Sequence, residues 1–166
     1  MVIGGGRVAL RKARRLVASG ARVSVVSPEV LPEFEGLVIE VNRRPYETGD
    51  LAGAALVFAA TDLREVNRAV VQEAREAGIP VNVADAPEDG DFAVPSVLQR
   101  GELQVAVSTG GASPTLARQV REALEERFTQ KWAKLVEELG AARRSGQRAE
   151  TELEGDVDKC LSQLRV

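Results

Sequence analysis

The sequence contains no histidine and only one cysteine, Cys160. Without an imidazole, metal ligation or proton shuttling by histidine and a Ser-His-Asp triad are excluded. One thiol cannot form an internal disulfide, so nothing indicates an oxidising compartment. A conventional zinc site is nearly excluded, and we expect no resident metal. Proton chemistry must therefore fall to carboxylates, hydroxyls, lysines or a bound cofactor.

The sequence also lacks long apolar runs and a strong excess of one charge. No run approaches the roughly 20 residues of a transmembrane helix and no signal peptide is visible, so we expect a cytoplasmic protein without a membrane partner. The formal net charge of -3 gives no support to a nucleic-acid partner. With 44% hydrophobic and 28% charged residues in 166, the chain can bury a core as one domain or one domain with an extension.

Strands and helices alternate in the first half of the sequence. Apolar spacing predicts a helix after the short strand Val2-Ile3, ending near Gly20. Further strands are predicted within 21–28, 37–45, 54–60 and 79–85, and a helix over 65–78. This alternation predicts an α/β fold with a Rossmann-type doubly wound parallel sheet.

The character of the sequence changes after Asp85. A turn-rich stretch precedes two strands around Arg100-Gly101, which predict a hairpin. A helix follows, with Ser113 at its N-cap and Pro114 at its first position. We expect a nucleotide-binding domain over 1–93, a small strand-helix module over 94–128 and a C-terminal helical region over 129–166.

Three glycines, Gly4, Gly5 and Gly6, come directly after the first strand and open a helix. Glycine lets the backbone approach phosphate, and the helix N-terminus offers free N–H groups and a partial positive charge. The pattern G-x-G-x-x-A, completed by Ala9, favours a dinucleotide, and a tight turn without a ligand is the alternative. The acidic residue expected about 20 positions later is absent at 26–27, so NAD and NADP both stay open.

Polar residues follow two other predicted strands. Thr61-Asp62 and Asp85 end buried strands, and ligands of open parallel sheets bind beyond such ends. Helix capping is the alternative role for Thr61-Asp62, and turn formation is the alternative for Asn82 and Asp85. Asn67 is expected to bind nearby backbone. Asp85 is the better functional candidate, because it should face a cleft in which desolvation raises its pKa.

Several motifs occur together and in a fixed order. They are GGGxVAxRK at 4–12, ATD…VN at 60–67, NVxDxP at 82–87, FxxPS at 92–96 and STGGxSPxLAR at 108–118. This set resembles the siroheme-synthase dehydrogenase family, which comprises stand-alone precorrin-2 dehydrogenases and the N-terminal module of multifunctional siroheme synthases. The resemblance covers about residues 1–127, and the tail after 130 matches only in being helical.

The resemblance implies NAD-dependent oxidation of precorrin-2, a tetrapyrrole with eight carboxylates, to sirohydrochlorin. It also implies a homodimer in which the module at 94–128 makes the dimer contact. The family's key aspartate falls on Asp85, a general base or a group that orients the macrocycle. The expected cofactor-binding residues are Gly4, Gly5, Gly6, Arg7, Val8, Ser27, Pro28, Glu29, Thr61 and Asp62.

Carboxylate-rich substrates are bound by arginines and helix N-termini. The expected substrate-binding residues are Asn82, Thr109, Gly110, Gly111, Ser113 and Arg118, with Arg100 and Arg121 as further arginine candidates. Each of these arginines is also a common type of solvated surface residue. Thr109 stands where some members of the family have serine, so it keeps the hydroxyl.

Two other functions and one question about the N-terminus stay open. Some members of the family also insert ferrous iron, and Asp85 with neighbouring carboxylates would then take protons from the pyrroles or steer the metal. A dinucleotide-sensing module without catalysis would need neither Asp85 nor the 108–118 motif. Relatives usually have a longer lead-in before the glycines, so we expect upstream residues, if encoded, to raise stability and NAD affinity.

Overall fold

The computed structural model describes residues 1–146 together with residues 155, 159 and 162. The chain divides into two compact units, 1–94 and 95–166. Cys160 and most of the expected C-terminal helical region beyond residue 146 lie outside the described residues. Among the helices of the described part, none is both long and apolar enough to cross a membrane.

The first unit is built on a five-stranded parallel sheet with the order β3-β2-β1-β4-β5. Its strands are β1 (Val2–Ile3), β2 (Ser24–Val26), β3 (Glu40–Asn42), β4 (Val57–Ala59) and β5 (Val81–Val83). The central strand β1 pairs with β2 on one side and with β4 on the other. The strand order therefore reverses between β1 and β4, and the predicted Rossmann-type fold is confirmed.

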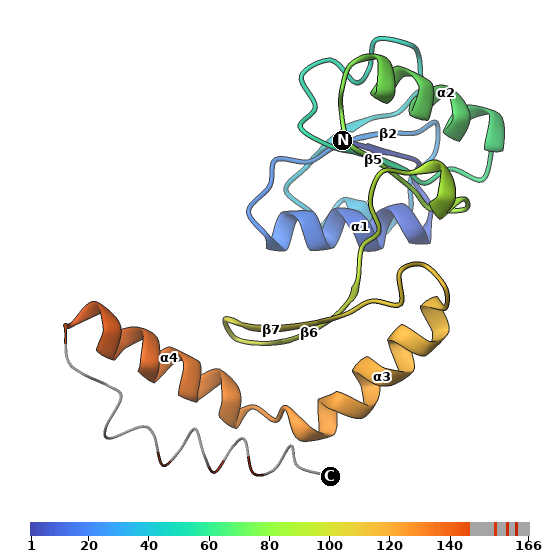
Figure 1. The fold of residues 1–166 in the computed structure, drawn as a ribbon. Coiled ribbons are helices and arrows are strands. Elements are labelled where there is room, and N and C mark those ends of the chain that lie inside the picture. The colour runs from blue at the N-terminus through green and yellow to red at the C-terminus, as the bar shows by residue number, and fades with distance from the viewer. Residues whose placement is uncertain (147–154, 156–158, 160–161, 163–166) are drawn as a thin grey trace. The chain divides into compact units, whose positions relative to one another are not determined.

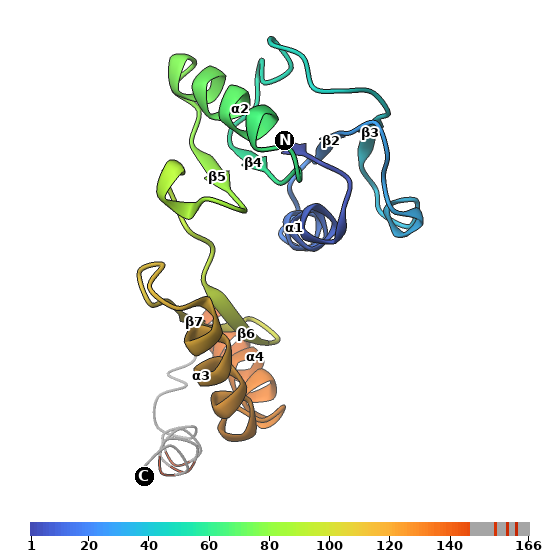
Figure 2. The same cartoon turned by 90° about the vertical axis from the view of Figure 1, so that its right-hand side faces the viewer.

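Helices α1 (Arg7–Ala18) and α2 (Arg64–Glu76) lie on opposite faces of this sheet (Figures 1 and 2). Helix α1 buries Ala9, Leu10 and Ala13, whose spacing places them on one side of the helix. It ends before Gly20, whose positive φ of 77° is the left-handed conformation that commonly follows a helix.

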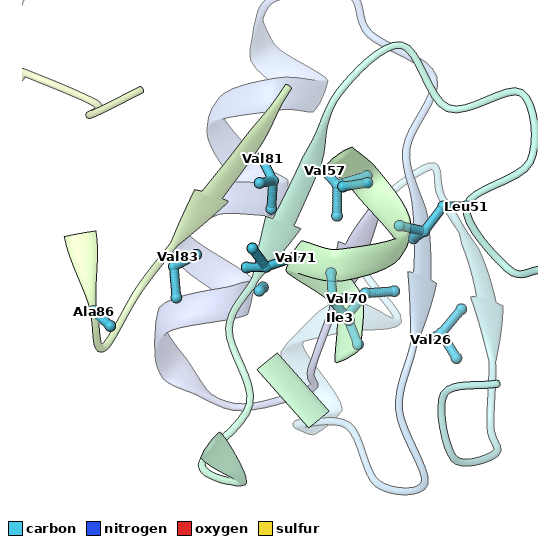
Figure 3. Packing of buried hydrophobic residues seen from close by; sticks show 11 residues of the cluster. Ile3, Val26, Leu51, Val57, Val70, Val71, Val81, Val83 and Ala86 are labelled. Carbon is cyan, nitrogen blue, oxygen red and sulfur yellow. The ribbon is translucent and has the colours of Figure 1, made fainter. Parts of the chain in front are cut away.

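The α2 face of the sheet is covered by aliphatic side chains, mainly valines. Val70 and Val71 of α2 pack against Val57, Val81 and Val83 of the two neighbouring strands (Figure 3). All three residues of β4 and of β5 are buried, because helices cover both faces of the sheet. This explains why β4 is apolar without the alternation of a half-exposed sheet, whereas β5 places one polar residue, Asn82, in a buried position.

The second unit contains the predicted antiparallel hairpin. Strands β6 (Ser96–Arg100) and β7 (Leu103–Val107) pair with Leu98 opposite Val105, and Gly101 in the turn has a φ of 58°. Helices α3 (Pro114–Arg127) and α4 (Lys131–Arg144) pack on this hairpin. Ser113 caps α3 as expected, because its Oγ accepts a hydrogen bond from the backbone N–H of Leu116 at 3.1 Å.

The segment between β3 and β4 contains no α-helix and is held to α2 by one carboxylate. Glu73 accepts hydrogen bonds from the Tyr46 hydroxyl and from the backbone N–H groups of Gly49 at 3.0 Å and Leu51 at 3.1 Å. Burial, and then the bond to Glu73, raise the pKa of Tyr46, so the phenol stays a donor. Leu51 is fully buried, so these bonds also fix a core residue.

We predict that Glu73→Ala lowers the free energy of unfolding by about 2–3 kcal/mol, because it leaves partly buried donors without an acceptor. Urea denaturation measures the change. Glu76→Ala is the matched control, since Glu76 is exposed on the same helix and, among the described residues, bonds only the Gln72 side chain. This substitution should shift stability by less than about 0.5 kcal/mol. Equal effects of the two substitutions would contradict this role of Glu73.

Candidate active site

The loops that follow β1, β2 and β4 touch at the point where the strand order reverses. A Cβ atom on Gly4 would lie 2.4 Å from the carbonyl oxygen of Ala60, and its φ is 121°. A Cβ atom on Gly5 would lie 1.9 Å from the carbonyl oxygen of Glu29, and the Leu31 N–H donates to the Gly5 carbonyl at 3.0 Å. The fold itself therefore requires the first two glycines.

Gly6 is different, because no packing contact requires it to be glycine. Its φ is -82° and no atom lies within 4 Å of an added Cβ. Gly6 is the N-cap of α1, no side chain caps the helix, and the first turn contains no acid. The first N–H groups of α1 have no intrahelical acceptor, and they belong to the residues directly after this open position. The arrangement fits the pyrophosphate of a dinucleotide.

Five of the other expected cofactor residues lie on the loop after β2 and in the first turn of α1. Ser27 is buried, and its hydroxyl donates to the Glu29 carbonyl at 2.6 Å, so it shapes the loop after β2. Pro28 and Glu29 are exposed on that loop. Arg7 and Val8, in the first turn of α1, are exposed as well.

A buried asparagine joins the ends of β4 and β5. Asn67 is 2% exposed, and its Nδ2 donates to Asp85 Oδ1 at 2.9 Å and to the Thr61 carbonyl at 3.1 Å. Its Oδ1 accepts from the Thr61 N–H at 3.2 Å. The N-cap of α2 is Leu63, without a side-chain cap, so the capping interpretation of Thr61 and the exposed Asp62 was wrong.

Asp85 lines a pocket of about 450 Å³ between α2 and the segment at the end of β5. The carboxylate is exposed in this chain, and the desolvation that we expected around it is absent. The reason is geometric, because β5 ends at Val83 and the following turn carries Asp85 beyond the edge of the sheet. Asp85 thus stands at the carboxyl edge, oriented by Asn67 and open to a ligand.

Asn82, which we expected to bind substrate, does not line this pocket. Successive residues of a strand point to opposite faces, so Asn82 faces α1 while Val81 and Val83 face α2. Asn82 is 5% exposed, and its Nδ2 donates to the Phe92 carbonyl at 2.7 Å. Both polar ends of the side chain are engaged inside the first unit, because Oδ1 accepts from Lys12.

Lys12 places an ammonium group inside the α1 face of the sheet. Its Nζ donates to Asn82 Oδ1 at 2.5 Å and lies 4.7 Å from the centre of the Phe58 ring. Burial, with a smaller contribution from Arg11 and Arg15, lowers the pKa of Lys12 to about 8. The hydrogen bonds from Lys12 to Asn82 and from Asn82 to Phe92 fix the segment that follows the Asp85 loop.

The roles of Lys12 and Asn67 were not predicted, although each residue leaves a signal in the sequence. Lys12 occupies the helix face formed by Ala9, Ala13 and Leu16, and a cation on an apolar face needs a partner. Asn67 falls on the inward face of α2 among valines, where an amide also needs partners. Its expected bond to nearby backbone is confirmed, and its bond to Asp85 was not foreseen.

The expected substrate residues from Thr109 to Ser113 lie in one loop before α3, and Arg118 lies in the helix itself. Thr109 Oγ1 accepts from the Ser113 N–H at 3.0 Å, so this hydroxyl closes the loop. Gly110 and Gly111 have φ values of 61° and 89°, which explains why both are glycine. Arg118 is exposed, with its Nε 3.9 Å from Glu122.

The two further arginine candidates have local partners. Arg100 Nε donates to the Phe128 carbonyl at 2.6 Å, so Arg100 binds the C-terminal end of α3. Arg121 pairs with Glu122 at 2.9 Å and with Glu125 one turn later. These bonds give both residues a structural role within the second unit.

Comparison with known proteins follows the same division of the chain. A family profile described as NAD(P)-binding matches residues 1–96, and one described as the central part of sirohaem biosynthesis proteins matches residues 100–127. Siroheme synthase 2 of Aeromonas salmonicida (strain A449) is 46% identical over 146 residues, covering 86% of this chain and 30% of that protein. Siroheme synthase of Methylobacillus flagellatus is 50% identical over 129 residues, covering 75% and 28%.

The chain therefore spans about three tenths of the length of these curated relatives. A solved structure, that of SirC, precorrin-2 dehydrogenase, matches with a TM-score of 0.75 and 26% sequence identity. This match covers 99% of the present chain and 86% of the other. It extends through both units, whereas each family profile matches one part.

The position of Lys12 predicts a specific pH dependence of stability. Its pKa is about 8 in the folded chain and about 10.5 when exposed, so the unfolded state binds more protons between these values. The contribution of Lys12 to stability should therefore rise with pH from about 8 toward 10. Thermal unfolding at pH 7.5, 8.5 and 9.5 should show this rise in the wild type and a smaller one in Lys12→Met. Lys134→Met, at an exposed lysine of α4, should keep the wild-type slope. Parallel curves for Lys12→Met and the wild type would contradict the prediction.

Proposed function

The chain belongs to the family of precorrin-2 dehydrogenases and siroheme synthase N-terminal modules, and on this basis we propose that it oxidises precorrin-2 to sirohydrochlorin with NAD. The observation that carries the proposal is the Asp85 carboxylate, held by the buried Asn67 at the same sheet edge as the open N-terminus of α1. A dehydrogenase needs a proton acceptor beside a dinucleotide, and this edge offers both.

The dehydrogenation removes a hydride and a proton from the tetrapyrrole. NAD, when bound, supplies the hydride acceptor. Asp85 is the proposed proton acceptor: its Oδ1 is held by Asn67, and its Oδ2 makes no hydrogen bond within the described residues. Asn67 is fixed in turn by the Thr61 backbone, so the carboxylate has a defined direction. No histidine exists in the chain to compete for this role.

The proposed nucleotide site follows the loops after β1 and β2. The backbone N–H groups of Arg7 and Val8, next to the open space at Gly6, would hold the pyrophosphate, while Gly4 and Gly5 keep the neighbouring loops in contact. Glu29 is exposed on the loop after β2, where a carboxylate repels a 2′-phosphate. This charge supports NAD over NADP.

We assign the tetrapyrrole substrate and the assembly from the family. The proposed domains are an NAD-binding domain at 1–93, a dimerisation module at 94–128 and a helical region at 129–166. Within the module, Thr109, Gly110, Gly111, Ser113 and Arg118 are the proposed substrate residues, and a homodimer is the proposed assembly. Leu116 and Val120 support an interface, since they are 49% and 39% exposed one turn apart on α3. A cytoplasmic location and the additional ferrochelatase activity stay predictions.

Asp85→Asn should reduce turnover of precorrin-2 by about 100-fold or more, because the amide cannot accept the proton. Sirohydrochlorin absorbance reports turnover, and a titration with NAD should give a Kd within about twofold of the wild type. Glu88→Gln is the matched control, an exposed acid of the same loop, and should keep full activity.

Each outcome of this experiment has a distinct meaning. Wild-type protein that forms no sirohydrochlorin from precorrin-2 and NAD would reject the function. Unchanged turnover in Asp85→Asn would reject the role of Asp85 alone. Binding of NAD without any binding of the tetrapyrrole would favour the dinucleotide-sensing alternative.

The glycine loop predicts opposite effects for two neighbouring substitutions. Gly6→Ala places a methyl group in the open cradle, so NAD affinity should fall about tenfold or more while the Tm stays within about 2 °C. Gly5→Ala meets the Glu29 carbonyl at 1.9 Å and should lower the Tm by about 5 °C or more. Calorimetry and an NAD titration measure both. Wild-type NAD affinity in Gly6→Ala would place the pyrophosphate elsewhere.

A further inference from the structure

The pocket beside Asp85 is lined by apolar side chains and arginines to which the proposed function assigns no role. We propose that this pocket binds one acid-bearing ring of the tetrapyrrole and that Arg68 pairs with a carboxylate of that ring. The inference rests on the proposed function, because it deepens the site around Asp85. It assigns a binding role to α2, a helix that carries none of the expected substrate residues.

The floor and the rim of the pocket differ in polarity. Val71, Val83 and Ala86 line it and are buried members of the α2-side core. Arg64 and Arg68 also line it and are exposed. An apolar floor beneath a cationic rim matches a ring with short carboxyalkyl chains, whose carbon atoms cover the floor while their carboxylates reach the guanidinium groups.

Arg68 is the arginine of this rim without a partner. Arg64 lies 3.8 Å from the Asp89 carboxylate, and Arg75 donates to the Asp89 carbonyl at 3.0 Å, so both are tied to the turn after β5. Arg68 makes no hydrogen bond or ion pair within the described residues. It also follows Arg64 by four positions, and like charges at this spacing repel on a helix. A bound carboxylate would supply the missing counter-charge.

None of the acidic residues that line the pocket pairs with Arg68 within the described residues. Asp85 accepts from Asn67, Asp89 faces Arg64, and Glu76 accepts from Gln72. Each acid therefore has a neighbour of its own, and Arg68 remains available to an incoming anion. A ring anchored by Arg68 would lie in the same pocket as the Asp85 carboxylate, as proton transfer requires.

The size of the pocket supports a ring instead of a single carboxylate. Its volume of about 450 Å³ falls within the roughly 300–1,000 Å³ of small-molecule sites. The pocket is also open to solvent, so the remainder of a macrocycle can extend out of it. One ring with its acid chains is therefore the part of the substrate that we place here.

Steady-state kinetics with the full chain tests the inference. In Arg68→Gln the KM for precorrin-2 should rise about 10- to 100-fold, the range for a lost charge-assisted hydrogen bond. The kcat at saturation and the KM for NAD should stay within about twofold, which also shows that the variant is folded. Arg68→Lys keeps the charge but loses the planar guanidinium group. Its KM for precorrin-2 should fall between those of the wild type and Arg68→Gln.

Arg22→Gln is the control for a general change in surface charge, because Arg22 is exposed in the loop before β2 and lies outside the pocket. An absorbance titration with sirohydrochlorin should give the same order of affinities as the KM values. Normal turnover with an unchanged tetrapyrrole KM in Arg68→Gln would overturn the inference and leave the proposed function intact. Absence of both turnover and tetrapyrrole binding in the wild type would overturn the two together.

Discussion

The arrangement of the first unit depends on the close approach of three backbone segments at the carboxyl edge of the sheet. Gly4 touches the segment after β4, and Gly5 touches the segment after β2. A side chain at either position would push these segments apart, and the N-terminus of α1 would then move away from the edge. Gly6 gains its open cradle only because its two neighbours hold the loops together. Packing and binding are thus divided among three consecutive glycines, so identical residues have different physical roles.

The loop that carries Asp85 is held by hydrogen bonds at Asp85 itself and at Asp91 and Phe92, where the chain comes back to β5. Asn67 bonds the carboxylate from α2, on one face of the sheet. On the return side, the Asp91 N–H donates to the Val81 carbonyl at 2.8 Å, and the Asp91 carboxylate accepts from the Val81 N–H at 2.9 Å. The bond from Asn82 to Phe92 adds a third attachment, on the α1 face. Strand β5 therefore transmits restraints from both helices to a residue that is itself exposed.

Much of this fold could be predicted from the sequence, because the signals that form it are local. Glycines, apolar runs and helix periodicity located every strand and both α-helices of the first unit, and Ser113-Pro114 located the start of α3, whereas the short 3-10 helices Pro32–Phe34 and Pro87–Asp89 were not predicted. The strands are shorter than the apolar runs, since 54–60 contains only the three residues of β4, Val57–Ala59. The side-chain network could not be predicted in the same way. The bonds from Lys12 to Asn82 and from Asn67 to Asp85 link residues 70 and 18 positions apart, and they depend on which face of the sheet each one meets.

The same limit applies to the arginines, and it shows why charge alone is a poor guide to a binding residue. Arg100, Arg121 and Arg68 look equivalent in the sequence, yet the first two are bonded to α3 or to its glutamates. The hydrogen bonds and ion pairs of the folded chain distinguish an arginine that binds the end of a helix, such as Arg100, from Arg68, which lines a pocket without a counter-ion among the described residues. On α2, residues 64, 67, 68, 71 and 75 follow the helix period and line one pocket. One helical stripe therefore contributes the amide that orients Asp85, part of the apolar floor and the unpaired cation, so a single rigid element sets their relative positions.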